Sequence, residues 1–350
     1  MPQDEDHMSE EAVYSGLPQE EDRVVEPSLR PENFAGFVGQ GDVVENLKTW
    51  IGGARQRDET LDHVLLSGPP GLGKTTLAYI LANEMDSSIR STSGPALAKP
   101  RDLVGILTNL QRGDMLFIDE VHRMDARVEE YLYTAMEDYE ISIIIDPGPH
   151  SRSVTLPLKR FTLIGATTRE GLLSAPLRSR FQIAERLDYY PAEELKRIIL
   201  ASASRLELQV EEDAAMQMAA CARGTPRVAN RYLRRIRDVA HARGQDVITR
   251  EVAEEGLDML GVDENGLCEM DRRILRAVAQ NGGRPIGLKT LSVVVGEQED
   301  TIEEVYEPYL IRRGFLEKTP RGRLLTPRGL DYLGLEPGEV PQEDGQKDLF

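Results

Sequence analysis

The sequence has few cysteines and no long apolar segment, and both absences narrow what the protein can be. Its two cysteines, Cys221 and Cys268, are far apart and lack the close spacing of a zinc site. The five histidines are scattered along the chain. No apolar run approaches the length that crosses a bilayer, and the first residues are acidic and polar, unlike a secretory signal peptide. These features predict a reduced, cytoplasmic protein without structural zinc or a membrane contact.

Basic residues are outnumbered by acidic ones, so the formal net charge at pH 7 is −18. Residues 1–28 contribute −8 and residues 331–350 contribute −5, which leaves about −5 for the rest of the chain. Both ends lack periodicity and contain proline and glycine, which predicts flexible tails at 1–27 and 336–350. The net charge therefore does not exclude local contacts with DNA, and the length allows two or three domains.

Residues 67–76, Ser-Gly-Pro-Pro-Gly-Leu-Gly-Lys-Thr-Thr, match the phosphate-binding loop Gly-x-x-x-x-Gly-Lys-Thr. Glycines such as Gly71 let backbone N–H groups point at phosphate oxygens. Lys74 can reach the β- and γ-phosphates, and Thr75 offers its hydroxyl to Mg²⁺. An apolar run precedes the loop and helical spacing follows it, as the motif requires. The alternative, a glycine-rich turn that binds nothing, is disfavoured by a second motif.

That second motif is the apolar run 115–120, which ends in two carboxylates. Asp119 is expected to hold Mg²⁺, mostly through water, and Glu120 to orient and polarise the attacking water. A further apolar run, 161–168, ends in Thr168, which could sense the γ-phosphate because ligands lie at the carboxyl ends of parallel strands. Together the motifs predict ATP hydrolysis with ATP and Mg²⁺.

Three other segments each allow two interpretations. The helix expected from Asp42 to about Gly52 either opens the domain or covers the adenine. The β-prone runs 141–145 and 153–157 predict an inserted hairpin, which is either a partner surface or part of the domain's own core. The two arginines in 174–181, Arg178 and Arg180, either form an internal salt bridge or place one guanidinium against the ATP of a neighbouring subunit, and the surrounding motifs favour the second interpretation.

From Pro191 onward the pattern is helical. Thr225 and Pro226 predict a helix start, which puts Arg227 in the first turn, where its guanidinium could bind a phosphate in a bidentate manner. Beyond about residue 266, three predicted helices and a hairpin follow in the order of a winged helix.

Charge within this last segment predicts how it would hold DNA. The third helix carries Glu303, Glu304 and Glu307, which would repel phosphates, whereas the hairpin and its approach are basic. We therefore predict that the wing holds the DNA backbone or minor groove. The predicted contacts are Arg313, Lys318, Arg321 and Arg323. A protein-binding winged helix is the alternative.

Taken together, these motifs resemble the RuvB family, the bacterial Holliday junction branch-migration motors of the AAA+ class. The resemblance covers about residues 28–335. It rests on segments 68–76, 117–123, 135–139, 165–169, 176–181, 223–227 and 319–323.

The resemblance implies an α/β fold with three parts. These are an AAA+ P-loop core with a parallel sheet over 28–190, including the hairpin at about 141–157, a helical lid over 191–265, and a winged-helix domain over 266–335. It implies a homohexameric ring that translocates duplex DNA without sequence preference in recombination and repair. RuvA would dock on the hairpin through Val154 and Leu156, and the RuvC resolvase would act with the ring.

The resemblance also implies roles for single residues. Lys74, Asp119, Glu120, Thr168 as sensor one and Arg180 as arginine finger would be catalytic, with Thr75 and Asp119 serving the metal. Nucleotide contacts would come from Leu29, Arg30, Gly71, Lys74, Thr75, Thr76, Glu137, Asp138, Tyr139, Arg180, Tyr190 and, as sensor two, Arg227.

Other functions and one further partner remain open. A clamp-loader ATPase predicts a C-terminal helical collar, whereas this sequence predicts a wing. An ATP-switched DNA-binding initiator shares the winged helix but does not translocate. The last five residues, from Gln346 to Phe350, resemble the pentapeptide that binds the bacterial sliding clamp, or are a chance sequence on a solubilising tail. The acidic N-terminal tail has no assigned role.

Overall fold

The computed structural model describes residues 28–144 and 153–336, which fall into two compact units that meet in sequence at Glu194 and Leu195. The N-terminal tail, the turn of the predicted hairpin and the pentapeptide at 346–350 lie outside the described residues. Within the described part of the chain, no helix has both the length and the apolar character needed to span a bilayer.

The first unit contains a five-stranded parallel sheet with the order β2-β3-β6-β1-β7. The inner strands are buried and were predicted from their continuous apolar runs, as expected for strands covered on both faces. The strands are β1 (Val64–Ser67), β2 (Ile89–Ser93), β3 (Met115–Asp119), β6 (Thr162–Thr167) and β7 (Ile183–Arg186). The edge strands β2 and β7 were not predicted, because they alternate exposed polar residues with few apolar ones.

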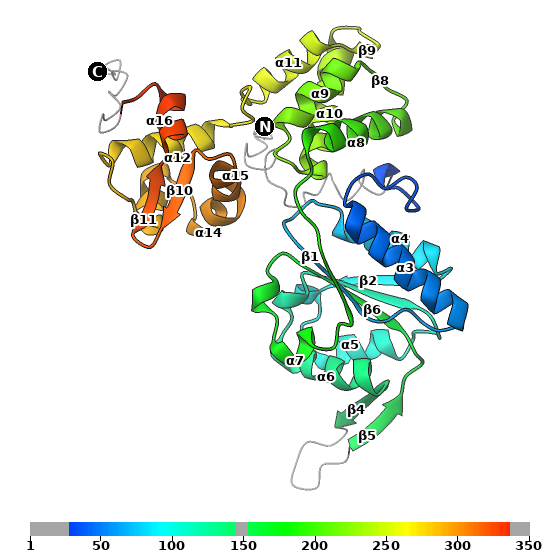
Figure 1. Ribbon diagram of the computed structural model, residues 1–350. Helices are drawn as coiled ribbons and strands as arrows, with labels where there is room; N and C mark the ends of the chain where they lie inside the picture. Colours follow the sequence, from blue (N-terminus) through cyan, green and yellow to red (C-terminus); the bar gives the residue numbers. More distant parts are fainter. Residues whose placement is uncertain (1–27, 145–152, 337–350) are drawn as a thin grey trace, which may run out of the picture. The chain divides into compact units, whose positions relative to one another are not determined.

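Helices cover both faces of this sheet (Figure 1). One face carries α3 (Gly41–Arg57) and α4 (Lys74–Glu84), and the other carries α5 (Pro100–Leu107), α6 (Ala126–Glu137) and α7 (Ala175–Arg178). The core beneath the second group is built from alternate strand residues and the apolar sides of these helices. Its members include Leu65, Leu116, Ile118, Leu163, Leu103, Val128, Leu132 and Leu177.

Helix α3 is longer than the sequence predicted. It continues past Gly52 to Arg57 and buries Ala54 as well as Val43, Leu47 and Ile51. A Cβ at Gly52 would meet nothing within 4 Å, so this glycine lies on the open side of the helix. Four buried apolar side chains at helical spacing therefore outweigh the low helix propensity of the two glycines.

The predicted hairpin consists of β4 (Glu140–Ile144) and β5 (Ser153–Pro157), which pair with each other and not with the main sheet. At its base Ile141 is fully buried and Leu156 packs against the core. Val154 is 41% exposed. The base of the hairpin therefore belongs to the domain's core, whereas its outer part faces solvent, where a partner surface stays a prediction.

The second unit begins with a helical part. It contains α9 (Glu212–Cys221), α10 (Pro226–Ala242) and α11 (Arg250–Met259), preceded by α8 (Ala192–Arg205), and a short parallel pair, β8 (Gln209–Val210) and β9 (Val247–Ile248). Helix α11 packs against both α9 and α10. These helices form a small bundle, as the sequence predicted for a lid.

A winged helix completes the second unit. Its helices are α12 (Glu269–Gln280), α13 (Leu288–Val295) and a third, broken helix of α14 (Glu299–Thr301), η4 (Ile302–Tyr306) and α15 (Glu307–Arg312). The wing is the hairpin of β10 (Leu316–Thr319) and β11 (Gly322–Leu325), followed by α16 (Pro327–Leu333). The predicted order of three helices and a hairpin is confirmed, and the last helix is an addition.

Candidate nucleotide site and DNA-binding wing

The loop between β1 and α4 has the backbone conformation of a phosphate cradle. Gly68, Gly71 and Gly73 have φ angles of 131°, 76° and 103°, which L side chains rarely adopt. A Cβ on Gly68 would also lie 2.4 Å from the carbonyl oxygen of Leu187. The loop leads directly into α4, whose positive N-terminal end favours bound phosphate.

Lys74 is the first residue of α4, and its ammonium lies within the loop. The Nζ donates hydrogen bonds to the carbonyl oxygens of Gly68, at 2.7 Å, and Pro69, at 2.8 Å. The residue is only 6% exposed. The charge is therefore held where a phosphate chain wrapped by the loop would meet it.

The predicted catalytic carboxylate and sensor lie together at the carboxyl ends of neighbouring strands. Glu120 follows β3, and Thr168 follows β6. The Thr168 hydroxyl donates to Glu120 Oε2 at 3.1 Å. Asp119 Oδ1 accepts from the Glu120 amide at 3.0 Å, and Glu120 has a φ of 47°, which turns the chain sharply at this point. The loop is tied to the same edge, since the Gly68 amide donates to the Thr167 carbonyl at 3.2 Å.

His122 is a residue of this site that the sequence did not suggest. A short 3₁₀ turn, η2 (Val121–Arg123), brings its Nδ1 to 3.2 Å from Glu120 Oε2 and 2.9 Å from Thr167 Oγ1. Burial lowers the pKa of His122, and the negative charge of Glu120 only partly opposes this shift. The ring is therefore neutral at neutral pH: it hydrogen-bonds with the Thr167 hydroxyl and lies close beside the Glu120 carboxylate.

Residues from the beginning and the end of the first unit's sequence, near positions 40 and 190, lie together beside the loop. The Tyr190 hydroxyl donates to the Leu72 carbonyl at 3.2 Å, and burial raises the pKa of Tyr190. Gln40 pairs twice with the Asp188 backbone, donating from Nε2 at 2.6 Å and accepting at Oε1 at 3.1 Å. A Cβ on Gly39 would lie 2.5 Å from the Tyr190 ring. Segments distant in sequence thus meet beside the loop.

The other predicted nucleotide contacts near this loop are on or next to α4. Thr75 and Thr76 lie in its first turn. Leu29 is buried, and the guanidinium of Arg30 lies 5.5 Å from the ring centroid of Tyr79, a residue of α4. Leu29 and Arg30 are therefore held against the domain that carries the loop.

Arg180 is held at a different place on the unit. Its NH2 pairs with Glu137 Oε2 at 2.8 Å, its NH1 donates to the Pro176 carbonyl at 2.8 Å, and its Nε donates to the Tyr133 carbonyl at 3.2 Å. These partners belong to α6 and α7, which lie across the sheet from α4 (Figure 1). The internal salt bridge considered from the sequence does form, yet the side chain is still 25% exposed.

The remaining predicted nucleotide contacts gather near Arg180. Glu137 and Asp138 are exposed at the end of α6. Tyr139 packs edge to face with Phe161, with ring centroids 5.9 Å apart, and the Arg160 guanidinium lies over the Tyr139 ring, 5.3 Å from its centroid. Within one subunit, the structure brings the loop, Glu120 and Thr168 together but keeps this group apart from them.

Arg227 belongs to the second unit. It lies in the first turn of α10, after Thr225 at the cap and Pro226 at the first position, as predicted. Four residues earlier, Arg223 has a φ of 56° and is buried in an ion pair with Asp271 of α12. The loop that presents Arg227 is therefore joined to the winged helix.

The wing presents only part of the predicted basic surface. Lys318 and Arg321 are exposed, and Arg313 is half-buried. Arg323 is 6% exposed and forms two hydrogen bonds with Glu307, one of them 2.9 Å long. The structure therefore does not support a DNA contact by Arg323.

The predicted repulsion of DNA by the third helix also needs correction. Glu307 is 1% exposed and its charge is neutralised by Arg323. Glu303 pairs with Lys318 at 2.6 Å. Two of the three carboxylates thus support the wing, because they hold its basic residues in place.

Comparison with known proteins matches three consecutive parts of the chain to family models. Residues 29–187 match the family model described as the Holliday junction DNA helicase RuvB P-loop domain. Residues 190–263 match the RuvB AAA lid domain, and residues 264–334 match the RuvB C-terminal winged helix domain.

Similar proteins cover nearly the whole chain. The Holliday junction branch migration complex subunit RuvB of Myxococcus xanthus is 55% identical over 323 residues, 92% of this chain and 94% of that protein. Its counterpart in Chlorobium luteolum is 56% identical over 87% of this chain and 89% of that protein. The solved structure of the Thermotoga maritima RuvB Holliday junction branch migration motor has a TM-score of 0.79 and 46% identity, and covers 90% of this chain and all of that one. The chain belongs to the RuvB family.

Proposed function

We propose that this chain is an ATP-driven motor that moves duplex DNA to migrate Holliday junctions, as the RuvB relatives are named for doing. The observation that carries the proposal is the joining of Glu120 and Thr168 beside a complete phosphate loop, in a chain that also bears a winged helix. A clamp loader would carry a helical collar in place of this wing.

The site's own residues supply most of the hydrolysis chemistry. Lys74 and the loop amides bind the β- and γ-phosphates, and Glu120 orients and polarises the attacking water. Thr168 donates to Glu120 and can donate to the γ-phosphate instead, so it reports whether that phosphate is present. Thr75 and Asp119 offer the oxygen ligands that Mg²⁺ prefers, and the ion would neutralise charge on the phosphates.

The site is completed by a second subunit. Arg180 is held by residues of α6 and α7, which lie across the sheet from α4, and this supports a role at the ATP of a neighbour for Arg180, Glu137, Asp138 and Tyr139. An arginine supplied in this way accelerates hydrolysis by about 10³–10⁵, or roughly 4–7 kcal/mol of barrier. Hydrolysis is therefore coupled to assembly of a ring, which we propose is a homohexamer.

Arg227 and the wing complete the proposed motor. Arg227 binds the γ-phosphate at the first turn of α10 and releases it after hydrolysis, so the lid over 191–265 changes its position. The wing grips the DNA backbone without sequence preference through Lys318 and Arg321, with Arg313 beside them.

The outer part of the hairpin offers a surface for a partner protein. RuvA docks on the hairpin, where exposed Val154 and part-buried Leu156 provide apolar contacts. RuvC acts on the same junctions, in the cytoplasm. Docking of residues 346–350 on the sliding clamp rests on sequence alone, and a titration of that peptide against purified clamp tests it: no saturable binding at high micromolar concentration contradicts it.

The central test replaces Arg180 by Ala. ATP hydrolysis is measured with and without duplex DNA and RuvA, alongside junction migration. We expect Arg180→Ala to abolish hydrolysis and migration while ATP binding is retained. Arg101→Ala, which removes a 78% exposed arginine of α5, is the matched control and should behave as wild type. Hydrolysis at the normal rate by Arg180→Ala would refute the role in trans, and binding without steady turnover by the wild type would indicate a switch and not a motor.

A further inference from the structure

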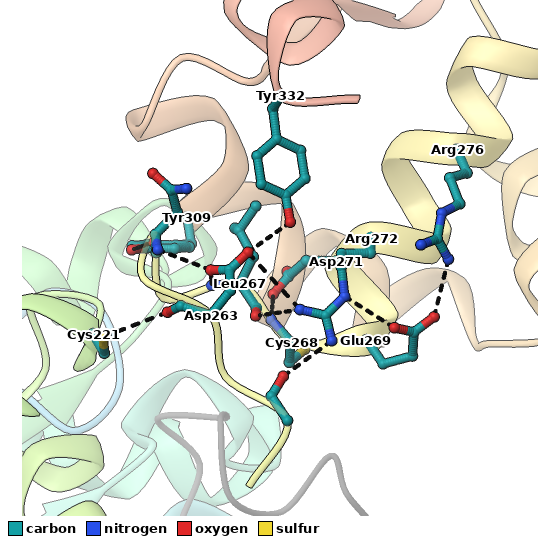
Figure 2. A network of polar contacts seen from close by, with 12 residues as sticks. Cys221, Asp263, Leu267, Cys268, Glu269, Asp271, Arg272, Arg276, Tyr309 and Tyr332 are labelled. Atoms are coloured by element: carbon teal, nitrogen blue, oxygen red, sulfur yellow. Dashed lines mark hydrogen bonds and ion pairs between the residues drawn. The ribbon is translucent and has the colours of Figure 1, made fainter. Parts of the chain in front are cut away.

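The connector between the lid and the winged helix is tightly bonded. Residues 260–268 join α11 to α12, and the Asp263 carboxylate is at their centre (Figure 2). Its Oδ1 accepts from the amides of Asn265, at 2.9 Å, and Leu267, at 2.8 Å. Its Oδ2 accepts from the Tyr332 hydroxyl at 2.6 Å and lies 3.8 Å from NH1 of Arg272. One carboxylate thus binds the connector, α12 and α16.

The connector is also packed against both of its neighbours. A Cβ on Gly266 would lie 2.7 Å from the Tyr309 hydroxyl and 2.9 Å from the Cys221 carbonyl oxygen. The Cys221 thiol donates to the Asp263 carbonyl at 3.5 Å, and the Tyr309 hydroxyl donates to the Asn265 carbonyl at 2.7 Å. Cys221 ends α9 of the lid and Tyr309 lies on α15 of the winged helix. Such a segment has no room for the backbone rotations of a hinge.

A buried ion pair adds a second link between the same parts. Arg223 pairs with Asp271, with side chains 4% and 0% exposed, and Asp271 also accepts from the Cys268 amide at 2.8 Å. The Arg223 guanidinium lies 5.0 Å from the ring centroid of Tyr309. Arg312 donates from the winged helix to the Arg223 carbonyl. Breaking one partner of a buried pair is strongly unfavourable, so this link resists separation of the two parts.

We infer that residues 223 and 260–271 form a rigid clasp between the lid and the winged helix. When the loop that carries Arg227 is displaced, this clasp makes the lid and the winged helix move together as one rigid body. The inference rests on the proposed function, because Arg227 must sense the nucleotide for its loop to be displaced. Arg223 is in this view a positioning residue: it lies four residues from Arg227 and transmits that residue's movement to α12.

The rigid body is tested by spin-label distances in the full chain with RuvA and a junction. One pair, Ser204→Cys with Val293→Cys, spans the lid and the winged helix at exposed positions. The other, Thr49→Cys with Val293→Cys, spans the first unit and the winged helix. The native Cys221 and Cys268 are each 1% exposed, so labelling is selective. Dilution with unlabelled subunits restricts the signal to distances within one chain.

We expect the lid to winged-helix distance to stay constant between ADP and a non-hydrolysable ATP analogue, while the other distance shifts. A lid to winged-helix distance that changes with nucleotide would overturn the inference, and so would two distances that both ignore the nucleotide. Absence of ATP-driven migration by the wild type would instead overturn the proposed function, and the distances would still show whether the clasp is rigid.

A functional arm measures junction migration per ATP hydrolysed. Asp263→Ala removes the centre of the clasp, and Tyr309→Phe removes a single hydroxyl and serves if the first variant folds poorly. We expect Asp263→Ala to hydrolyse ATP at the basal rate but to lose about fivefold or more in migration per ATP, with a smaller loss for Tyr309→Phe. Tyr131→Phe, on α6 in the first unit, is the matched control. A ratio equal to wild type in both clasp variants would refute transmission through the clasp.

Discussion

At the residue scale, the Glu120 carboxylate is held by two neighbours of different kinds. Thr168 comes from the end of β6 and His122 from the turn that follows β3 itself. The threonine can exchange its bond to Glu120 for one to a phosphate, whereas the buried histidine stays beside the carboxylate. We therefore expect His122 to restrict the orientation of Glu120, and we propose that Thr168 reports on the nucleotide.

We predict that His122→Ala lowers kcat for ATP about tenfold, because Glu120 loses a close neighbour that restricts its orientation; a tenfold loss corresponds to about 1.4 kcal/mol of barrier. KM for ATP should stay near the wild-type value, because His122 contacts Glu120 and Thr167 and not the loop. Steady-state ATPase kinetics with saturating DNA measure both constants. His122→Asn, which keeps a polar group, should recover part of the rate; an unchanged kcat in His122→Ala would contradict the assignment.

A second histidine makes stability depend on pH. His63 is 2% exposed, its Nδ1 accepts from the Leu163 amide at 2.9 Å, and its Nε2 is 3.1 Å from the Met136 carbonyl oxygen. Burial lowers the pKa of His63 below its ordinary value of 6.5. The unfolded chain therefore binds a proton more readily than the folded chain does.

We predict that the free energy of unfolding is fully present above pH 6.5 and falls as the pH is lowered from 6.5 toward the depressed pKa of His63. Urea unfolding followed at pH 7.5 and at successively lower pH measures this. In His63→Gln the decline over that window should be smaller, although the variant is less stable throughout. His241→Gln, at an exposed position, is the control and should keep the wild-type decline. An equal decline in all three proteins would rule out His63 as the cause.

At the scale of elements, the sequence predicted the buried inner strands of the sheet and missed the strands at its two edges. The inner strands β1, β3 and β6 are continuous apolar runs, so they were predicted. The edge strands β2 and β7 lacked that signal, because solvent on one side removes the need for apolar residues. The end of α3 was missed because Gly52 and Gly53 have low helix propensity and suggested that the helix ends there. The sequence alone did not show that the following turn buries Ala54.

The same limit applies to the site. Residues inside contiguous motifs, such as Lys74 and Glu120, could be predicted because their spacing along the chain carries the chemistry. His122 could not, since its role depends on a turn that folds it back onto Glu120. Arg323 was assigned to DNA from its position in a basic hairpin, and only the fold shows that it points toward Glu307. The contacts of Asp263 likewise join segments that no local pattern connects.

We predict that Arg321→Ala and Arg323→Ala, two changes on one hairpin, have different effects. Arg321 is exposed at the turn, so its loss should weaken duplex binding and reduce the slope of log affinity against log salt by about 1, with the thermal midpoint unchanged. Arg323→Ala leaves Glu307 buried without its partner and should destabilise the winged helix by about 3–5 kcal/mol. Titrations at several salt concentrations and thermal melts measure these effects; a salt slope unaffected by Arg321→Ala would contradict the proposed wing contact.

At the scale of the whole molecule, separation of Arg180 from Lys74 makes a prediction about mixtures. Lys74→Ala cannot bind the phosphates, and Arg180→Ala cannot complete a neighbour's site. Each variant alone should be inactive. In a mixed ring, however, the intact loop of one variant meets the intact arginine of the other.

We therefore predict that mixing Lys74→Ala and Arg180→Ala subunits restores ATP hydrolysis to a sizeable fraction of the wild-type rate. The rate should depend on the mixing ratio and be greatest near equal amounts. A mixture of Lys74→Ala with Glu120→Ala is the control: both lesions lie in the same half of the interface, so it should stay inactive. If the first mixture is as inactive as the second, both halves of the site come from one chain.

The hydrogen bonds of Lys74 also bear on which phosphate compounds the loop binds. Its ammonium is bonded to the carbonyls of Gly68 and Pro69, so an incoming ligand must displace two acceptors that the protein itself provides. We expect a chain of two or three phosphates to displace these acceptors more readily than a single phosphate, because it offers more anionic oxygens for charge-assisted hydrogen bonds. The two loop carbonyls would thus compete with a ligand for the Lys74 ammonium. On this basis we expect adenosine monophosphate and inorganic phosphate to bind the loop weakly and to leave it available to ATP.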